Sequence, residues 1–283
     1  MRDIWEEQLK WVETGEPFML ARVIRTWRSA PRKSGAGMLI GKGMDKDSLP
    51  KVLGSVSGGC IEGAVIEEAL DALENSDSRK LSFGVEDDLA LSVGLSCGGE
   101  VTVLLEKHWA FSTNPETKNV WNALQNCIRN NEPAILISPL PDESGYSVEN
   151  QSPLLILPEG ENVGGMQNNL EEAAALAKEA YKERENRIVE IGGKEFFMQV
   201  FPRRDQLLII GAGHITIPLV RFAKELDFLT VVIDPRTVFA NPERFPVAPD
   251  HLLSKWPDDV LPDFPLNEDT YAILLTHDPK IDD

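Results

Sequence analysis

Residues 207–236, "LLIIGAGHITIPLVRFAKELDFLTVVIDPR", decide the fold of this chain. The apolar run at 207–210 is typical of a strand buried in a parallel sheet, and it leads directly into the glycine turn "GAG". Gly211 permits the tight turn, and Gly213 lets a phosphate approach the backbone where a helix begins. A second apolar strand ends at Asp234. This order of strand, glycine turn, helix and strand predicts a Rossmann-type parallel sheet.

Side chains around this turn complete the expected ligand crevice. Asp234 lies 21 residues after Gly213, where a ribose-binding acid sits in dinucleotide-binding folds. His214 extends the glycine turn, and Arg236 would either contact a phosphate or neutralise Asp234. Thr216 stands where the motif has a third Gly or Ala, and we expect it to push the helix away from the strand. The fold alone does not identify the ligand.

A polar break at residues 202–206, "PRRDQ", separates two predicted domains, residues 1–204 and 205–283. The first mixes helical and strand patterns, including a hairpin with "GG" as its turn, and is expected to be a mixed α/β domain. The second is the Rossmann-like parallel-sheet domain. Because a doubly wound sheet continues beyond its crossover and this chain stops soon after "YAILL", we expect the second domain to be truncated.

The composition limits the classes of function. The chain has 283 residues, of which 42% are hydrophobic and 26% charged, as in soluble globular proteins. The first 17 residues lack the apolar run that a signal peptide has, and no membrane-length apolar run follows. Three widely spaced cysteines fit neither a disulfide framework nor a zinc motif, so we expect a cytoplasmic protein. The net charge of −18 argues against nucleic acid and membrane partners.

A glycine-rich loop at residues 54–65, "GSVSGGCIEGAV", is the first candidate site. Gly58 and Gly59 would expose backbone N–H groups, and the helix that begins near Cys60 adds its positive dipole end. These features predict an anion cradle and a Cys60 thiol that is partly ionised at neutral pH. Glu62 would orient a ligand or a proton. The alternative is a tight packing turn with a small buried cysteine.

A second cysteine motif, "GLSCGGE" at residues 94–100, repeats this chemistry. Cys97 is followed by Gly98 and Gly99 in a predicted turn between two strands. Two scarce cysteines in two glycine loops indicate a function more strongly than either would alone.

The segment between Pro17 and Met44 is locally basic in an acidic chain. It contains no Asp or Glu, and its cations are Arg22, Arg25, Arg28, Arg32, Lys33 and Lys42. One interpretation is a basic patch that attracts a small anion. The other is a row of exposed residues that alternate along an edge strand, "MLARVIRTW".

The chain resembles the xanthine dehydrogenase accessory factor family, XdhC/CoxI. The motifs "SAPRKSGAGMLI", "GSVSGGCIEGAV", "LSCGGEV", "LLIIGAGHI", "VVIDPR" and "THDPK" occur here in the order that this family shows. The similarity covers both ends of the chain and is weak through residues 111–200. The glycine–cysteine motif together with the downstream "GAGH" is specific, whereas either one alone is not.

This resemblance implies a chaperone for the molybdenum cofactor and no turnover enzyme. Family members resemble proteins that bind the molybdopterin cofactor, help replace an oxo ligand by a sulfido ligand, and serve a xanthine dehydrogenase-type molybdoenzyme of purine catabolism. A cysteine desulfurase supplies the sulfur, and a homodimer is an open option. The residues that would lie at the cofactor, carried over by position, are Arg32, Gly58, Gly59, Cys60, Cys97, Gly98 and Gly99. No catalytic residue is assigned, and metal ligands are undetermined.

Two other functions remain open from the residues. An NAD(P)-dependent oxidoreductase would use "GAGHI" and Asp234, although the four histidines form no recognisable acid–base motif. A persulfide sulfurtransferase would use Cys60 or Cys97 as its sulfur carrier. Xanthine dehydrogenase activity itself is not expected, because the chain has no iron–sulfur cysteine pattern and is too small for the usual redox centres.

Overall fold

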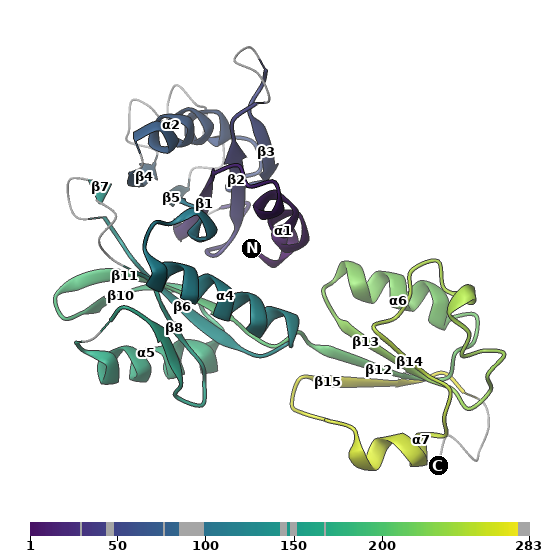
Figure 1. Ribbon diagram of the computed structural model, residues 1–283. Helices are drawn as coiled ribbons and strands as arrows, with labels where there is room; N and C mark the ends of the chain where they lie inside the picture. The colour runs from purple at the N-terminus through teal and green to yellow at the C-terminus, as the bar shows by residue number, and fades with distance from the viewer. Residues whose placement is uncertain are drawn as a thin grey trace. The chain divides into compact units, whose positions relative to one another are not determined.

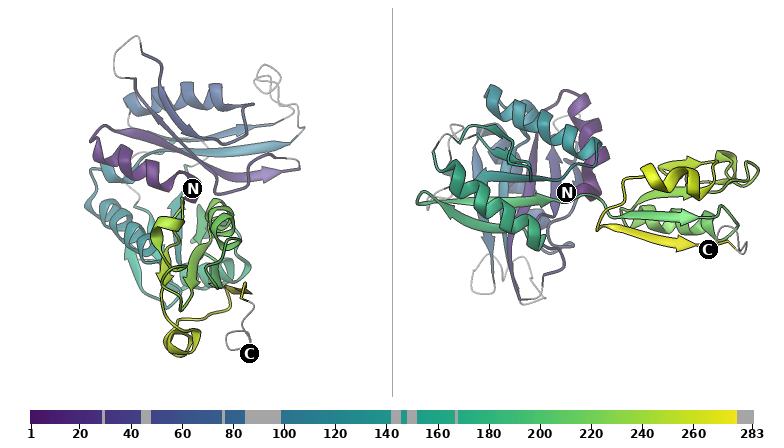
Figure 2. Two further views of the ribbon diagram at one scale, coloured as in Figure 1. Left: turned by 90° about the vertical axis from the view of Figure 1, so that its right-hand side faces the viewer. Right: turned by 90° about the horizontal axis from the view of Figure 1, so that it is seen from below.

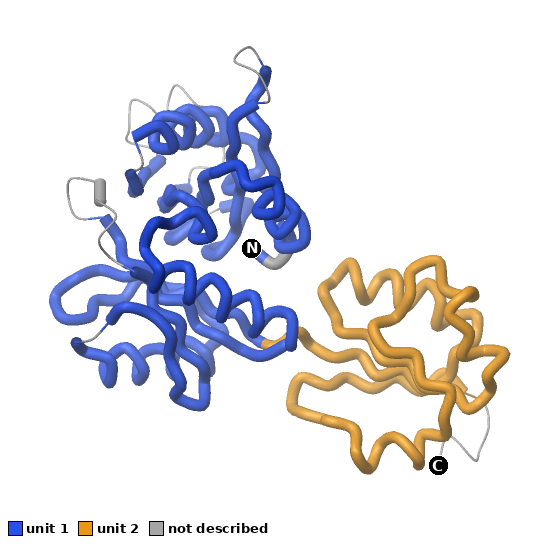
Figure 3. Tube along the Cα trace, viewed as in Figure 1, with its two compact units in different colours: residues 1–202 blue, residues 203–283 orange. Residues whose placement is uncertain are grey.

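The computed structural model describes residues 1–28, 30–43, 48–75, 77–84, 99–141, 146–147, 152–166 and 168–276. The chain divides into two compact units, residues 1–202 and 203–283 (Figure 3). Unit 1 is built on antiparallel sheets and unit 2 on a parallel one, which confirms the predicted mixed α/β fold. Within these described ranges, no helix combines the length and apolar character needed to cross a bilayer.

The first sheet of unit 1 has six strands, and every neighbouring pair is antiparallel. In spatial order these are β3 (Lys51–Gly54), β2 (Gly37–Gly41), β1 (Phe18–Trp27), β5 (Glu100–Lys107), β4 (Ser78–Phe83) and β7 (Tyr146–Ser147). The strand β1 lies inside the sheet, with its first seven residues buried. The edge-strand interpretation of "MLARVIRTW" is therefore wrong, because β1 has β2 and β5 as its neighbours.

Helix α2 (Glu62–Asn75) covers one face of this sheet (Figure 1). Its buried residues Val65, Ala69 and Ala72 follow the spacing of one helix face, and they pack against Val23, Val103 and other strand residues. Small side chains on this face let the helix approach the strands closely. The predicted helix after Cys60 is thus confirmed.

The second sheet of unit 1 has five antiparallel strands, one face of which is covered by α5 (Leu170–Glu183). In spatial order the strands are β10 (Arg187–Ile191), β11 (Lys194–Phe201), β6 (Ala134–Pro139), β8 (Leu154–Ile156) and β9 (Asn162–Gly164). The hairpin of β10 and β11 turns at Gly192 and Gly193, with φ of +56° and +77°. Glycine suits this turn because other residues rarely adopt positive φ.

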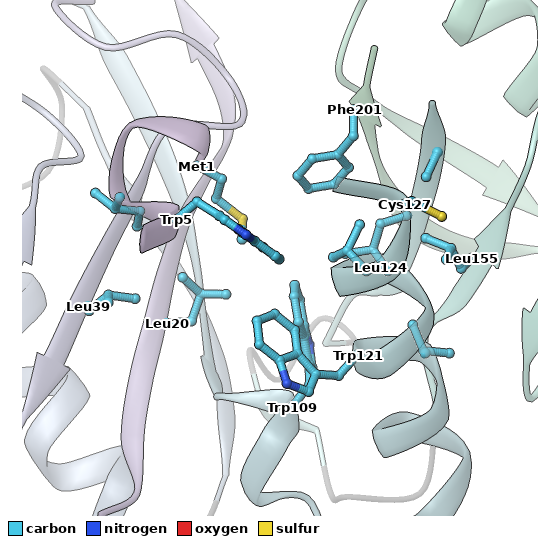
Figure 4. Packing of buried hydrophobic residues seen from close by; sticks show 14 of the residues in the cluster. Met1, Trp5, Leu20, Leu39, Trp109, Trp121, Leu124, Cys127, Leu155 and Phe201 are labelled. Carbon is cyan, nitrogen blue, oxygen red and sulfur yellow. The ribbon is translucent and has the colours of Figure 1, made fainter. Parts of the chain in front are cut away.

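An aromatic core lies between the two sheets of unit 1. It contains α1 (Trp5–Glu13) and α4 (Pro115–Arg129) together with strand residues from both sheets. Trp5 and Trp109 gather around Trp121, with ring centroids 5.2 and 6.2 Å from it (Figure 4). His108 is fully buried beside Trp121, and burial lowers its pKa to about 3. The histidine therefore belongs to the core as a neutral ring.

Unit 2 is a four-stranded parallel sheet with a helix on each face (Figures 1 and 2). In spatial order its strands are β14 (His251–Leu253), β13 (Leu229–Ile233), β12 (Gln206–Ile210) and β15 (Thr270–Leu274). Helix α6 (Thr216–Glu225) packs on one face of the sheet, and α7 (Pro257–Val260) lies beside the other. In chain order this arrangement is 3-2-1-4, which is how a Rossmann sheet begins. The Rossmann-like prediction is confirmed.

Candidate functional site

Pairing within the six-stranded sheet brings the candidate loops of unit 1 to one end. Trp27, at the end of β1, pairs with Glu100 at the start of β5, and Phe83, at the end of β4, pairs with Val101. On the other side of β1, β2 begins at Gly37, which pairs with Arg22, five residues before the end of β1, and β3 ends at Gly54, which pairs with Met38. The turn that carries Arg32, the loop that follows Gly54, and Gly99 therefore all leave the sheet at the same end.

The glycine loop after β3 folds around the carboxylate of Glu62. The two carboxylate oxygens accept six hydrogen bonds from this loop, at donor–acceptor distances of 2.5 to 3.2 Å. The donors are the backbone N–H groups of Val56, Ser57, Gly58 and Gly59 and the side-chain hydroxyls of Ser55 and Ser57. The carboxylate thus has the position that an external anion would take in such a nest of N–H groups.

Glu62 is held as an anion by these contacts. Burial alone would raise the pKa of Glu62, but hydrogen bonds from Ser55 and Ser57 outweigh burial and lower the pKa to about 2. The prediction that this loop cradles a ligand phosphate is therefore wrong as it stands, because the N–H groups already have an internal anion. The physical reason is that Glu62, in the first turn of α2, reaches back over the loop.

Cys60 lies at the edge of this locked loop. Its backbone N–H donates to the hydroxyl of Ser57 at 3.0 Å, and the same hydroxyl accepts from Ile61 at 3.1 Å, so Ser57 caps the start of α2. The Cys60 side chain is half-buried against the core beneath α2. Beside it, a Cβ built on Gly59 would meet no atom within 4 Å, so this side of the loop is open. The thiol is thus held on a rigid support with open space next to it.

Arg32 lies in the turn between β1 and β2, near the same loop. Pro31, its neighbour in the chain, is 3.4 Å from the ideal Cβ position of Gly58. The Arg32 guanidinium pairs with Asp3 at 2.5 Å, and the two side chains are 34% and 47% exposed. Exposed ion pairs contribute little to stability, so Arg32 can exchange Asp3 for a ligand anion at small cost. Its contact with a ligand phosphate stays a prediction.

Arg22 does not belong to any surface anion patch. Its side chain is fully buried between the two sheets of unit 1 and pairs with Glu106 at 2.5 Å. It also donates to Ser138 at 2.7 Å and to Gln199 at 3.0 Å. Burial lowers the pKa of Arg22, and Glu106 opposes that shift. The basic-patch prediction is therefore wrong for Arg22, which joins the two sheets of unit 1.

A hollow of about 300 Å³ lies at the same end of the sheet. Its lining residues come from three adjacent strands and the chain that follows them: Arg25, Trp27, Ser82, Phe83, Gly84, Glu100 and Thr102. The sequence did not identify Trp27 or Glu100 as site residues, although Glu100 ends the second cysteine motif, because no local pattern assigns either side chain a role. Cross-strand pairing, which brings them together, is not visible in a single sequence.

Part of the second cysteine motif lies outside the described residues. This applies to Cys97 and Gly98, so their predicted place at a ligand stays untested. Gly99 is described, and it is buried immediately before β5. Within the described ranges, no group of three or more His, Cys, Asp or Glu side chains is arranged to hold a metal ion.

The glycine turn of unit 2 has the expected geometry. Gly211 has φ of +104°, and a Cβ there would lie 2.9 Å from the Thr276 side chain, so both conformation and space require glycine. Gly213 has no atom within 4 Å of its ideal Cβ position, and His214 is exposed. Thr216 is buried and donates its hydroxyl to the Gly211 carbonyl at 2.6 Å. It ties the helix to the turn, contrary to the expectation that it pushes the two apart.

Asp234 and Arg236 form a closed pair at the end of β13. The Asp234 carboxylate is fully buried and accepts from the N–H of Ala212 at 2.8 Å. The Arg236 side chain donates to both of its oxygens, at 2.9 and 2.7 Å. Burial would raise the pKa of Asp234, but the bonds from Arg236 and Ala212 lower it. The alternative in which Arg236 neutralises Asp234 is the one observed, whereas ribose binding by Asp234 would require Arg236 to move.

Comparison with known families and proteins gives consistent matches at both ends of the chain. The model of the XdhC and CoxI family matches residues 11–84, and the model of the XdhC Rossmann domain matches residues 207–283. Over 273 residues the chain is 24% identical to a probable xanthine dehydrogenase subunit of Bacillus subtilis (strain 168), covering 94% of this chain and 74% of that protein. Over 106 residues it is 30% identical to the uncharacterized protein YqeB of Escherichia coli (strain K12), a match that covers 38% of this chain and 18% of that protein.

A solved structure is similar over nearly the whole chain. It is the crystal structure of a xanthine dehydrogenase from Bacillus halodurans, with a TM-score of 0.75 and 25% sequence identity. The match covers 98% of this chain and 75% of that one. The fold described above is therefore shared over both units.

Proposed function

Because the chain belongs to the XdhC and CoxI family, as matches in both of its units show, we propose that it is an accessory protein for a xanthine dehydrogenase-type molybdoenzyme. In this proposal it binds a molybdopterin-type molybdenum cofactor as cargo and presents it for sulfuration or insertion. A cysteine desulfurase would supply the sulfur. The names of the Bacillus relatives, which refer to xanthine dehydrogenase, support this assignment.

The observation that carries the proposal is the gathering of unlike chemistry at one end of the six-stranded sheet. Cys60 supplies a soft sulfur ligand on a rigid loop, and soft thiolates suit soft metal centres and sulfur chemistry. Arg32 supplies an exchangeable cation for a phosphate. The loop N–H groups are taken by Glu62, so the cargo phosphate is assigned to Arg32 and not to the glycine nest.

The residues of this chain would hold and orient the cargo, and no turnover step is assigned to them. The Glu62 carboxylate accepts from the N–H of Gly59, just before Cys60, and the Ser57 hydroxyl accepts from the N–H of Cys60, so the two together fix the backbone that carries the thiol. The open side of Gly59 leaves space for a bulky group beside that thiol. The molybdenum centre, when bound, would supply the site at which oxo and sulfido ligands exchange.

Cofactor retention tests the proposal. The protein is purified from a host that makes molybdopterin, and released ligand is identified by mass spectrometry and metal analysis. We expect pterin and molybdenum with the wild type, and at least a tenfold loss with Cys60→Ala. The matched control is Cys127→Ala, which removes a buried thiol from α4 and should retain the cargo. Equal retention by the wild type, Cys60→Ala and Cys127→Ala would show that Cys60 does not help to hold the cargo.

The same preparation separates the two other functions. Binding of NADH with no pterin present would favour the NAD(P)-dependent oxidoreductase, for which Gly211 and Gly213 provide the turn. A mass increase of one sulfur on Cys60 after incubation with a desulfurase and cysteine would favour the sulfurtransferase. Neither result is expected from a carrier that only binds the cofactor.

A further inference from the structure

A β-bulge in β1 changes which side chains face the hollow beside Trp27. Val23 pairs with Val103 of β5, but Arg25 pairs with Thr102, so one extra residue is inserted between Val23 and Arg25. Directly paired residues of an antiparallel sheet have their side chains on the same face. The bulge therefore places Arg25 on the face of Thr102, away from α2, and such re-aiming is a known use of bulges near functional sites.

Two cross-strand rows then form the floor of this hollow. The first runs from Arg25 through Thr102 to Ser82, whose hydroxyl lies 3.5 Å from that of Thr102. The second runs from Trp27 to Glu100 and on to Gly84. An ideal Cβ on Gly84 would lie 3.1 Å from Cγ of Glu100, so glycine leaves the room that the Glu100 side chain uses.

The lining of this hollow contains two charged side chains that have no partner in the described part of the chain, together with an exposed aromatic ring. Among the described residues, the side chains of Arg25 and Glu100 have neither an ion-pair nor a hydrogen-bond partner, although both are exposed at one hollow. The Trp27 side chain is 46% exposed even with the Arg28 guanidinium 4.0 Å from its ring centroid. An aromatic face, a carboxylate and a guanidinium together suit a planar heterocycle that carries both N–H donors and an acceptor oxygen.

We propose that this hollow binds a 2-amino-4-oxopyrimidine ring, the edge that pterins share with guanine. The Glu100 carboxylate would accept from the exocyclic amino group and the adjacent ring N–H, while Trp27 stacks on the ring and Arg25 donates to the carbonyl oxygen. This inference rests on the proposed function, because it gives the pterin part of the cargo a site of its own. The hollow opens on the face of the sheet away from α2, whereas Cys60 packs on the α2 side, and both lie towards the same end of the strands.

Simple ligands test this inference without molybdenum or dithiolene sulfur. Calorimetric titration would compare neopterin with lumazine, which has an oxygen where pterin has the amino group, and guanosine monophosphate with inosine monophosphate. We expect the amino-bearing member of each pair to bind at least tenfold more tightly. Tighter binding of neopterin than of guanosine monophosphate assigns the site to a pterin, and the reverse order assigns it to guanine.

Protein variants then locate the binding. Glu100→Gln should abolish the preference for the amino-bearing ligand, because its amide N–H₂ would face the ligand's donors. Trp27→Leu should weaken the binding of all four ligands. Glu67→Gln, on the exposed side of α2, is the matched control and should bind like the wild type. An unchanged preference in Glu100→Gln, or no binding up to about 1 mM, overturns the inference.

The two proposals fail in different ways. If the chain retains molybdenum cofactor and Glu100→Gln retains it equally well, the pterin subsite is wrong and the accessory function stands. If amino-selective binding depends on Glu100 but no cofactor is found on the purified protein, the ring-binding subsite stands and the accessory function fails.

Discussion

Replacing Glu62 by Gln tests the lock on the cysteine loop. One carboxylate oxygen of Glu62 accepts from Gly59 and from the Ser57 hydroxyl, and the other accepts from the rest of the loop. In Glu62→Gln, an amide N–H₂ replaces one of these acceptors and faces donors instead. The Ser57 hydroxyl cannot simply reverse its role, because it already accepts from Cys60 and Ile61.

The expected loss in the free energy of unfolding is about 2 kcal/mol. Hydrogen bonds to a charged group contribute about 1.5–3 kcal/mol each, and two of them are lost while water replaces part of each at this half-buried loop. The pKa of Glu62 gives a similar value. A fall from 4.5 to about 2 corresponds to an upper limit of about 3.4 kcal/mol, which solvent screening of the loop reduces.

Urea unfolding at pH 7, followed by tryptophan fluorescence, measures this loss. Five of the six tryptophans lie in unit 1, so the signal reports mainly on the unit that contains Glu62. Glu67→Gln on the same helix, where the side chain is exposed, is the control and should change stability by less than about 0.5 kcal/mol. A loss below about 0.5 kcal/mol in Glu62→Gln would refute the claim that the Glu62 carboxylate holds this loop in place.

The difference in the free energy of unfolding between the wild type and Glu62→Gln should change with pH in one direction only. The pKa of Glu62 is lower in the folded state than in the unfolded state, so its stabilisation is complete above the unfolded value of about 4.5. It is lost as the pH falls towards the folded value of about 2. The gap between wild type and Glu62→Gln should therefore be constant from pH 8 to about 5 and should narrow below about 4.5. A gap that widens on acidification would contradict this assignment.

Three other perturbations test the two units. Arg22→Met should lower the stability of unit 1 by about 3–5 kcal/mol in urea, because it leaves Glu106 unpaired between the sheets, and adding Glu106→Gln should recover part of that loss. Between pH 6.5 and about 3 only the unfolded His108 is protonated, so this histidine should lower the wild type's free energy of unfolding by about 1.4 kcal/mol for each unit that the pH falls. His108→Phe should remove this loss, and equal pH slopes in the two proteins would count against a buried neutral ring. Thr216→Val should lower the stability of unit 2 by about 1–2 kcal/mol, because it leaves the Gly211 carbonyl without its donor. The loss should appear as faster hydrogen exchange in α6, and unchanged exchange would show that this bond is dispensable.

Local patterns predicted the fold well. The Rossmann strand, the turn at Gly211 and the hairpin turn at Gly192 are each fixed by residues close together in the sequence. The short strand β14 was not predicted, because it has only three residues and its side chains are not fully buried.

The site was predicted only in part, because its chemistry depends on distant partners. The cysteine loop was identified correctly as a nest of N–H groups, but sequence alone does not show that Glu62 folds back to fill it. Arg22 was misplaced because its partners Ser138 and Gln199 lie more than a hundred residues away. The bulge before Arg25 is equally invisible, since it exists only relative to β5.

The most direct test of the account is the identity of the ligand that the purified protein carries. Protein from a molybdopterin-producing host is denatured, and the released small molecules are identified by mass spectrometry, with molybdenum measured in parallel. We expect a pterin and molybdenum in equal amounts, both lost in Cys60→Ala and both retained in Cys127→Ala. Release of NAD with neither pterin nor molybdenum would contradict it.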